Sequence, residues 1–205
     1  MIENYNNQIL SLIAQGDLLL LESNKLEPLS RYANVLLGGT PSRTHPEYWN
    51  GDISWINSGA ITGSPAILHC SEKITDLGVK KSATKCANAG ETVLSIIEPS
   101  KEKVSLILDD KVYFNQSVIC ISAKDHHWQG LMFFASRKLI DDIKGYATGA
   151  AQQSINKDLV EKERIIISND LTIQKLEIIK NRIIDLENKI RVLKIQKDLL
   201  LCKYF

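Results

Sequence analysis

Residues 171–205 carry the pattern that most constrains how this chain can fold. Their apolar residues repeat every seven positions, in one series of Leu176, Ile183 and Ile190 and another of Ile179, Leu186, Leu193 and Leu200. Neither glycine nor proline interrupts the stretch, so it predicts one continuous helix with an apolar seam. A single helix cannot hide such a seam from water, and we expect the seam to pair with another helix. The alternative is that the helix packs back on its own domain.

Charge is distributed unevenly between this helix and the rest of the chain. Residues 171–205 hold eight Lys and Arg against four Asp and Glu, whereas residues 1–170 hold seventeen against twenty. Any contact with a polyanionic partner outside the helix must therefore come from local loops and not from a basic face. Lys197 falls on the seam itself, where a polar residue favours one register or orientation at some cost in stability.

The composition is that of an ordinary globular protein. Of 205 residues, 44% are hydrophobic and 24% are charged, which is enough to bury a core. No long apolar run predicts a membrane span, and the first residues lack the pattern of a secretory signal, so we expect a cytoplasmic protein. The four cysteines include no C-x-x-C pair and are expected to be reduced thiols.

Three regions are predicted along the chain. Residues 1–25 indicate a short helical arm that ends at Gly16 and Asp17. Residues 26–170 contain short β-branched runs separated by turn residues, which is typical of strands. The predicted strands are 53–56, 66–68, 92–97, 104–108, 112–121 and 164–167, with a helix at 127–144. Together with the helix at 171–205, these elements predict an α+β fold, in which a mixed β-rich domain precedes a long C-terminal helix.

The sequence contains none of the common catalytic or cofactor motifs. The run Gly38-Gly39-Thr40-Pro41-Ser42 lacks the Lys-Ser/Thr of a phosphate-binding loop, and no G-x-G-x-x-G follows a strand. The four histidines lack the spacing of zinc-binding motifs, and no hydrolase nucleophile motif is present. We therefore expect a binding or scaffolding protein with no cofactor and no metal, and not an enzyme.

Five segments of the sequence resemble the specificity subunit of type I restriction–modification systems. They are GGTPS at 38–42 with EYWNGDISWI at 47–56, KITDLG at 73–78, Asn115-Gln116, GAAQQSINKDL at 149–159, and the helix at 171–205. They occur in the order found in that family and together cover residues 38–205. Family members usually carry two recognition domains and two spacer helices, whereas this sequence shows one of each.

The resemblance implies a non-catalytic DNA-recognition subunit. Residues 26–170 would be its target recognition domain, and residues 171–205 its spacer and dimerisation helix. The subunit would direct methyltransferase (modification) subunits and a restriction subunit to a bipartite site on double-stranded DNA. S-adenosylmethionine would bind to the methyltransferase partner. The rival interpretation is an interaction protein that does not bind DNA and dimerises through its C-terminal helix.

Polar loops of the domain supply the candidate DNA contacts, because hydrogen-bonding side chains read base edges while Lys and Arg hold phosphates. The candidates are Thr40, Ser42, Arg43, His45, Asn57, Ser58, Lys80, Lys81, Lys85, Gln152, Gln153 and Ser154. Arg43 either makes a bidentate contact to guanine or is a solvated surface residue. The lysines either hold phosphates or form a solvated turn. The loop at 152–154 either reads adenine or holds itself through backbone hydrogen bonds.

One recognition domain and one helix predict a two-fold homodimer with antiparallel C-terminal helices. A helix of 35 residues is about 50 Å long, which spans roughly 15 base pairs. Two identical domains would then read identical half-sites in opposite orientation, separated by an uncontacted spacer. The alternative is that the helix pairs with a different specificity half or with the methyltransferase.

Overall fold

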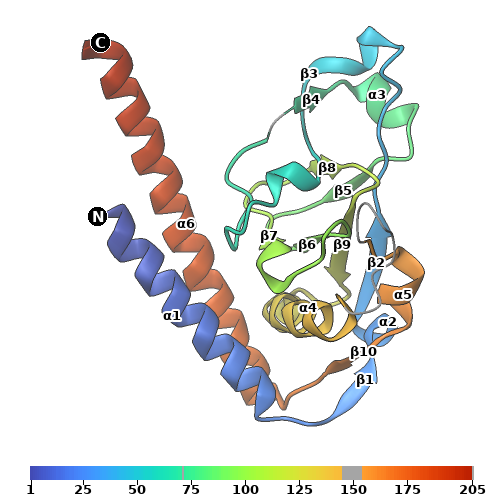
Figure 1. Ribbon diagram of the computed structural model, residues 1–205, viewed down its shortest axis with the longest axis vertical. Helices are drawn as coiled ribbons and strands as arrows, with labels where there is room; N and C mark the ends of the chain where they lie inside the picture. Colours follow the sequence, from blue (N-terminus) through green and yellow to red (C-terminus); the bar gives the residue numbers. More distant parts are fainter. Residues whose placement is uncertain (71, 145–153, 205) are drawn as a thin grey trace.

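The computed structural model describes residues 1–70, 72–144 and 154–204. Figure 1 shows a β-rich body and a long helix, α6 (Asp170–Tyr204), which leaves the base of the body and rises beside it. A second helix, α1 (Ile2–Leu21), runs along the lower part of α6. This arrangement confirms the predicted α+β fold with a long C-terminal helix. None of the helices in the described part of the chain is long and apolar enough to cross a membrane.

Two four-stranded sheets form the body. The first is antiparallel, in the order β2 (Ala33–Leu37), β9 (Val118–Ala123), β6 (Thr92–Ser95) and β7 (Val104–Leu106). The second has the order β4 (Glu72–Ile74), β3 (Trp49–Ile56), β8 (Val112–Phe114) and β5 (Lys85–Ala87), with β3 and β8 parallel. At the base, β1 (Leu26–Pro28) pairs with β10 (Arg164–Ile166), which joins the segment after α1 to the segment before α6.

Helices and short helical turns connect these strands. The helices are α2 (Leu29–Tyr32), α3 (Asp76–Lys80), α4 (Gln129–Ile143) and α5 (Lys157–Lys162). The 3-10 turns are η1 (Pro46–Tyr48), η2 (Ser58–Ala60), η3 (Lys101–Lys103) and η4 (His126–Trp128). The longest of them, α4, packs on the first sheet, and each of its residues from 131 to 137 is buried. A second apolar cluster, which includes Ile56, Phe114 and Val118, draws on strands of both sheets.

The predicted strand at 112–121 is two strands in different sheets. Asn115 makes the turn between β8 and β9: its side-chain Oδ1 accepts the backbone N–H of Ser117 at 3.0 Å, and its carbonyl accepts that of Val118 at 3.2 Å. The apolar pattern continues through the turn, so it does not mark the break. The predicted strand at 66–68 is also wrong, because there Ala66 contributes only an isolated bridge to β7.

The helix α1 continues through the two residues predicted to end it. Gly16 is buried against α4, and a Cβ at this position would lie 2.1 Å from Phe134 Cζ. Asp17 accepts hydrogen bonds from the buried Arg137 at 3.1 and 3.0 Å. The predicted helix end is therefore wrong: the glycine allows two helices to approach closely, and the aspartate is an ion-pair partner.

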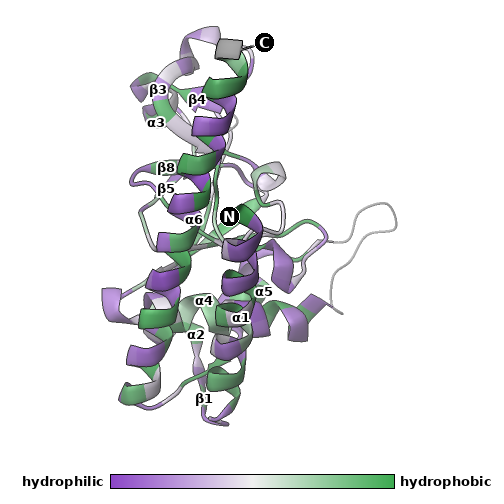
Figure 2. Ribbon diagram, turned by 90° about the vertical axis from the view of Figure 1, so that its left-hand side faces the viewer, coloured by the Kyte–Doolittle hydropathy of each residue, from purple (hydrophilic) through white to green (hydrophobic). Residues whose placement is uncertain are grey.

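The first part of the α6 seam is buried within its own chain. The buried members are Leu176, Ile179, Ile183, Leu186 and Ile190, in the part of α6 that packs on α1 and α4. The expectation that these five residues pair with a helix of another chain is wrong, because α1 and α4 of the same chain cover them. Leu193 is only half-buried and Leu200 is 57% exposed. Figure 2 shows α6 continuing past the N-terminal end of α1, with hydrophobic turns in this last stretch.

Candidate nucleic-acid interface

The loop between β2 and β3 is anchored by a pair of buried glycines. A Cβ on Gly38 would lie 2.1 Å from the carbonyl oxygen of Phe114, and one on Gly39 would lie 2.6 Å from the carbonyl carbon of Ala83. Only residues without a side chain allow this path across the end of β8. The loop then runs to the end of the body farthest from α4, where β3, β4 and α3 lie (Figure 1).

Arg43 is held in this loop by a carboxylate and an aromatic ring. Its Nη1 and Nη2 donate to the two carboxylate oxygens of Glu72 at 2.5 and 2.9 Å. Its guanidinium carbon lies 3.5 Å from the ring centre of Trp49. The hydrogen bond from Arg43 lowers the pKa of Glu72, which keeps this carboxylate charged at neutral pH. Glu72 thus occupies the edge of Arg43 that would bind a guanine end-on, so such a contact requires Glu72 to move away.

The hydroxyl groups of the same loop bind neighbouring side chains. Thr40 Oγ1 donates to Gln116 Oε1 at 2.5 Å, which ties the loop to the turn between β8 and β9. The hydroxyl groups of Ser42 and Thr44 lie 2.8 Å apart. These contacts order an otherwise exposed loop, and the hydroxyl groups of Ser42 and Thr44 retain access to solvent.

Two other candidates make contacts that order the local backbone. His45 Nδ1 lies 2.9 Å from Glu47 Oε1, just before η1. Asn57 Oδ1 accepts the backbone N–H of Gly59 at 2.8 Å and so caps η2, where Ser58 is the first residue. Asn57 thus has a structural role, and its amide nitrogen is the part of the side chain left for a ligand.

The three candidate lysines lie beside the base of the loop. Lys80 ends α3, which packs on η1, and Lys81 follows it. Lys85 begins β5, close to the segment that touches Gly39. All three side chains are exposed. The structure therefore gathers seven candidates at one end of the body, and we call this group the distal surface: Thr40, Ser42, Arg43, His45, Lys80, Lys81 and Lys85.

Three further candidates stand at positions 152–154. Gln152 and Gln153 lie outside the described residues. Ser154 forms an isolated bridge with Ile97, which follows β6 in the first sheet, and the neighbouring Ile155 donates its N–H to the carbonyl of Ile96 at 3.0 Å. Backbone pairing thus holds Ser154 near the first sheet, whereas the distal surface belongs to the second.

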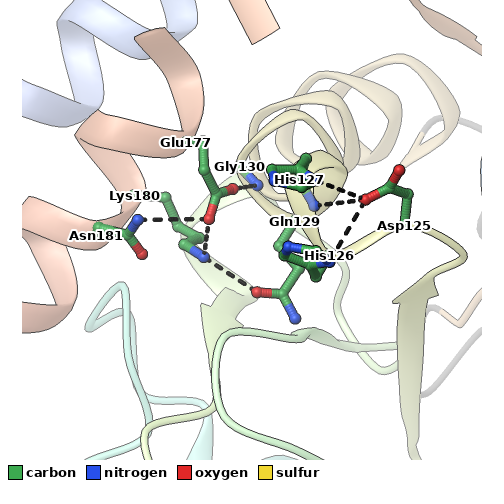
Figure 3. Close-up of polar contacts among 8 residues, drawn as sticks. All are labelled: Asp125, His126, His127, Gln129, Gly130, Glu177, Lys180 and Asn181. Atoms are coloured by element: carbon green, nitrogen blue, oxygen red, sulfur yellow. Dashed lines mark hydrogen bonds and ion pairs between the residues drawn. The ribbon is translucent and has the colours of Figure 1, made fainter. Parts of the chain in front are cut away.

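A partly buried ion pair fixes α6 to the body (Figure 3). Lys180, whose side chain is 3% exposed, donates to Glu177 Oε1 at 2.6 Å and to Gln129 Oε1 at 3.1 Å. Glu177 Oε2 in turn accepts the backbone N–H of Gly130 at 2.7 Å. A Cβ on Gly130 would lie 2.6 Å from the backbone nitrogen of Glu177, so α4 begins in contact with the α6 backbone. Because each charge is paired, this contact favours one docking angle between α6 and the body.

Two further polar contacts join α6 to the body nearer its C-terminal end. Ser64 Oγ donates to Glu187 Oε1 at 2.9 Å, and burial raises the pKa of this glutamate. Arg191 Nη1 lies 2.9 and 2.8 Å from the two carboxylate oxygens of Asp109. We call these α6 residues and the Glu177–Lys180 pair the polar stripe. They hold the β-rich body on the helix at three successive points.

One family profile matches most of this chain. The sequence profile described as the type I restriction modification DNA specificity domain matches residues 33–197. The chain belongs to this family. The match confirms the resemblance drawn from five short segments, and it spans both the body and most of α6. A specificity domain of this family is non-catalytic.

Two solved structures share the fold of this specificity subunit. The HsdS subunit from Thermoanaerobacter tengcongensis has 12% sequence identity and a TM-score of 0.55, over 93% of this chain and 50% of that chain. The S subunit of a type-I restriction-modification system from M. genitalium has 10% identity and a TM-score of 0.55, over 100% of this chain and 57% of that chain. The chain thus spans about half the length of these two solved chains. A comparison with curated protein sequences gives no match.

Proposed function

We propose that this specificity subunit recognises a bipartite DNA site through its distal surface and directs methyltransferase and restriction subunits to it. The family match over residues 33–197 carries the proposal. The distal surface supports it, because exposed lysines lie beside the base of a loop that presents hydroxyl, imidazole and guanidinium groups. In this arrangement Lys80, Lys81 and Lys85 hold phosphates while the loop contacts base edges.

In the proposed complex, Arg43 exchanges Glu72 for a guanine. Its Nη1 and Nη2 then donate to O6 and N7 in the major groove, and Trp49 keeps the guanidinium plane in place. At any other base, Arg43 loses its carboxylate partner without gaining an equivalent one. The Glu72 pair therefore increases the cost of a wrong base and adds specificity more than affinity.

We also propose that two copies of the subunit pair through the C-terminal part of α6. Large apolar residues are exposed there, at fractions from 46% to 65%: Val192, Ile195, Leu199, Leu200 and Leu201. An antiparallel second copy would cover these residues with the same residues of its own helix. Two identical recognition domains would then read identical half-sites in opposite orientation. The part of the helix buried by α1 takes no part in this contact.

Binding measured in a salt series tests the DNA-recognition proposal. In the presence of a type I methyltransferase subunit, the unmodified chain should prefer one duplex sequence, and log Kd should change linearly with log salt. Replacement of Lys80, Lys81 and Lys85 by alanine should reduce that slope by up to about three, roughly one for each lost phosphate contact. Replacement of Lys175, an exposed lysine on α6, is the matched control. Equal binding to all duplexes, or none, would favour the rival interaction protein.

A further inference from the structure

Asp125, His126 and His127 bring three metal-binding groups together on the protein surface (Figure 3). Asp125 Oδ1 lies 2.9 Å from His127 Nδ1 and 3.6 Å from His126 Nδ1. One ligand atom from each residue lies within 4.8 Å of the other two. The ring centres are 3.8 Å apart, so the 3-10 turn η4 holds both imidazoles on the same side. Zinc motifs are recognised by ligands spaced along the chain, and three consecutive residues therefore give no such signal.

The separations between these atoms suit a small divalent ion. Zinc binds imidazole nitrogen and carboxylate oxygen at about 2.0–2.2 Å in a tetrahedral arrangement, which places neighbouring ligand atoms about 3.4 Å apart. The two distances from Asp125 to the imidazoles lie on either side of this value. Small side-chain rotations are therefore enough to bring the three groups around one ion.

The carboxylate is held in place before any ion binds. Asp125 Oδ1 accepts the backbone N–H of His127 at 2.9 Å, and this cap of η4 orients the side chain toward both rings. The side chains of His126 and His127 are 79% and 70% exposed. Each ring can therefore carry its proton on Nε2, in contact with water, and leave the Nδ1 lone pair free for a metal.

We propose that these three residues bind one Zn²⁺ ion, through His126 Nδ1, His127 Nδ1 and a carboxylate oxygen of Asp125, with water at the fourth position. The ion would join the segment after β9 to the turn that begins α4. The next residue after that turn is Gln129, which accepts a hydrogen bond from Lys180 of α6. Zinc would thus stabilise the contact between the β-rich body and α6. The proposal does not depend on DNA binding.

Calorimetric titration of the untagged full chain with zinc sulfate tests this site. The unmodified protein should bind one ion per chain. His126→Ala and His127→Ala should each weaken binding by more than about tenfold, because the loss of an outer-shell partner alone costs ten- to a hundredfold. Zinc should also raise the melting temperature of the unmodified chain but not that of His127→Ala.

The matched control is His45→Ala. His45 also lies 2.9 Å from a carboxylate, that of Glu47, but it offers one imidazole where the proposed site offers two. This variant should bind zinc with unchanged affinity. The proposal is overturned if the unmodified chain binds no zinc, if either variant at 126 or 127 binds as tightly, or if His45→Ala loses affinity to the same extent. Circular dichroism checks that each variant is folded, which the exposure of these rings leads us to expect.

Discussion

Single residues set how closely the backbone segments of this subunit approach one another. At Gly16, a Cβ would overlap the ring of Phe134, because α1 and α4 cross there in close contact. Gly16→Ala should therefore lower the free energy of unfolding by about 1–3 kcal/mol, as measured by urea denaturation. Gln15→Ala, at the exposed neighbouring position, should change it by less than about 0.5 kcal/mol. The double variant, Gly16→Ala with Phe134→Leu, should lose less free energy of unfolding than the sum of the losses in the two single variants, because leucine is smaller than phenylalanine at this contact.

At the same scale, one arginine is expected to determine one base pair. Arg43→Ala should weaken binding to the preferred duplex by roughly 1–3 kcal/mol and relax the preference at a single position. Arg43→Lys keeps the charge but cannot form two parallel hydrogen bonds, so it should restore little of that preference. Competition binding with duplexes substituted at each position measures both quantities. Equal weakening on every sequence would mean that Arg43 contacts a phosphate instead.

The sequence made Arg43 a candidate but gave no sign of its partner. An arginine that follows a rigid proline turn is a candidate for a bidentate contact to guanine, although a solvated arginine fits the same pattern. Glu72 lies 29 positions away and reaches Arg43 only because β3 and β4 pair. Side-chain pairs set by strand register are not encoded in any local pattern, so this part of the site required the structure.

Among the helices, α6 shows what a periodic pattern can and cannot predict. The seven-residue repeat predicted residues 171–205, and the helix spans Asp170–Tyr204. Periodicity shows which face is apolar, but it does not show what covers that face. Here α1 and α4 cover it as far as Ile190, and α1 itself was predicted too short because Gly16 was interpreted as a helix end.

The polar stripe predicts that Lys180 contributes more to the free energy of unfolding than the exposed lysines of α6 do. Lys180→Met leaves the Glu177 carboxylate without its cation, and the free energy of unfolding should fall by about 1–3 kcal/mol. Lys175→Met, at an exposed position on the same helix, should change it by less than about 0.5 kcal/mol. The combination of Lys180→Met with Glu177→Gln should recover part of the loss, because no unpaired charge remains. Thermal or urea unfolding measures all three variants.

Glu187 makes the attachment of α6 sensitive to pH. Burial raises its pKa in the folded chain above the ordinary 4.5, so the unfolded chain releases this proton first. The contribution of Glu187 to stability is therefore full at low pH and falls as pH rises through the folded-state pKa. Relative to the unmodified chain, Glu187→Gln should gain stability as pH increases from about 4 to 7. Urea unfolding across this range checks the prediction, and a difference that stays constant with pH would contradict it.

At the scale of the whole molecule, the exposed end of α6 predicts self-association. Replacement of both Leu199 and Leu200 by glutamate should give monomers in sedimentation at concentrations where the unmodified chain is a dimer. The control is Ile178→Glu, a residue that is 68% exposed on the part of α6 flanked by α1. This variant should remain dimeric. A monomeric unmodified chain at tens of micromolar would contradict the homodimer and favour a different helix partner.

Sequence selection from a random duplex library tests specific recognition most directly. The unmodified subunit, assembled with its methyltransferase subunit, should enrich two half-sites in opposite orientation with a fixed spacing between them. The same selection with Arg43→Ala should return the same motif with one guanine position randomised in each half-site. Enrichment of no motif by the assembled complex would contradict DNA recognition by this chain. A motif unchanged by Arg43→Ala would contradict the role given to the distal surface.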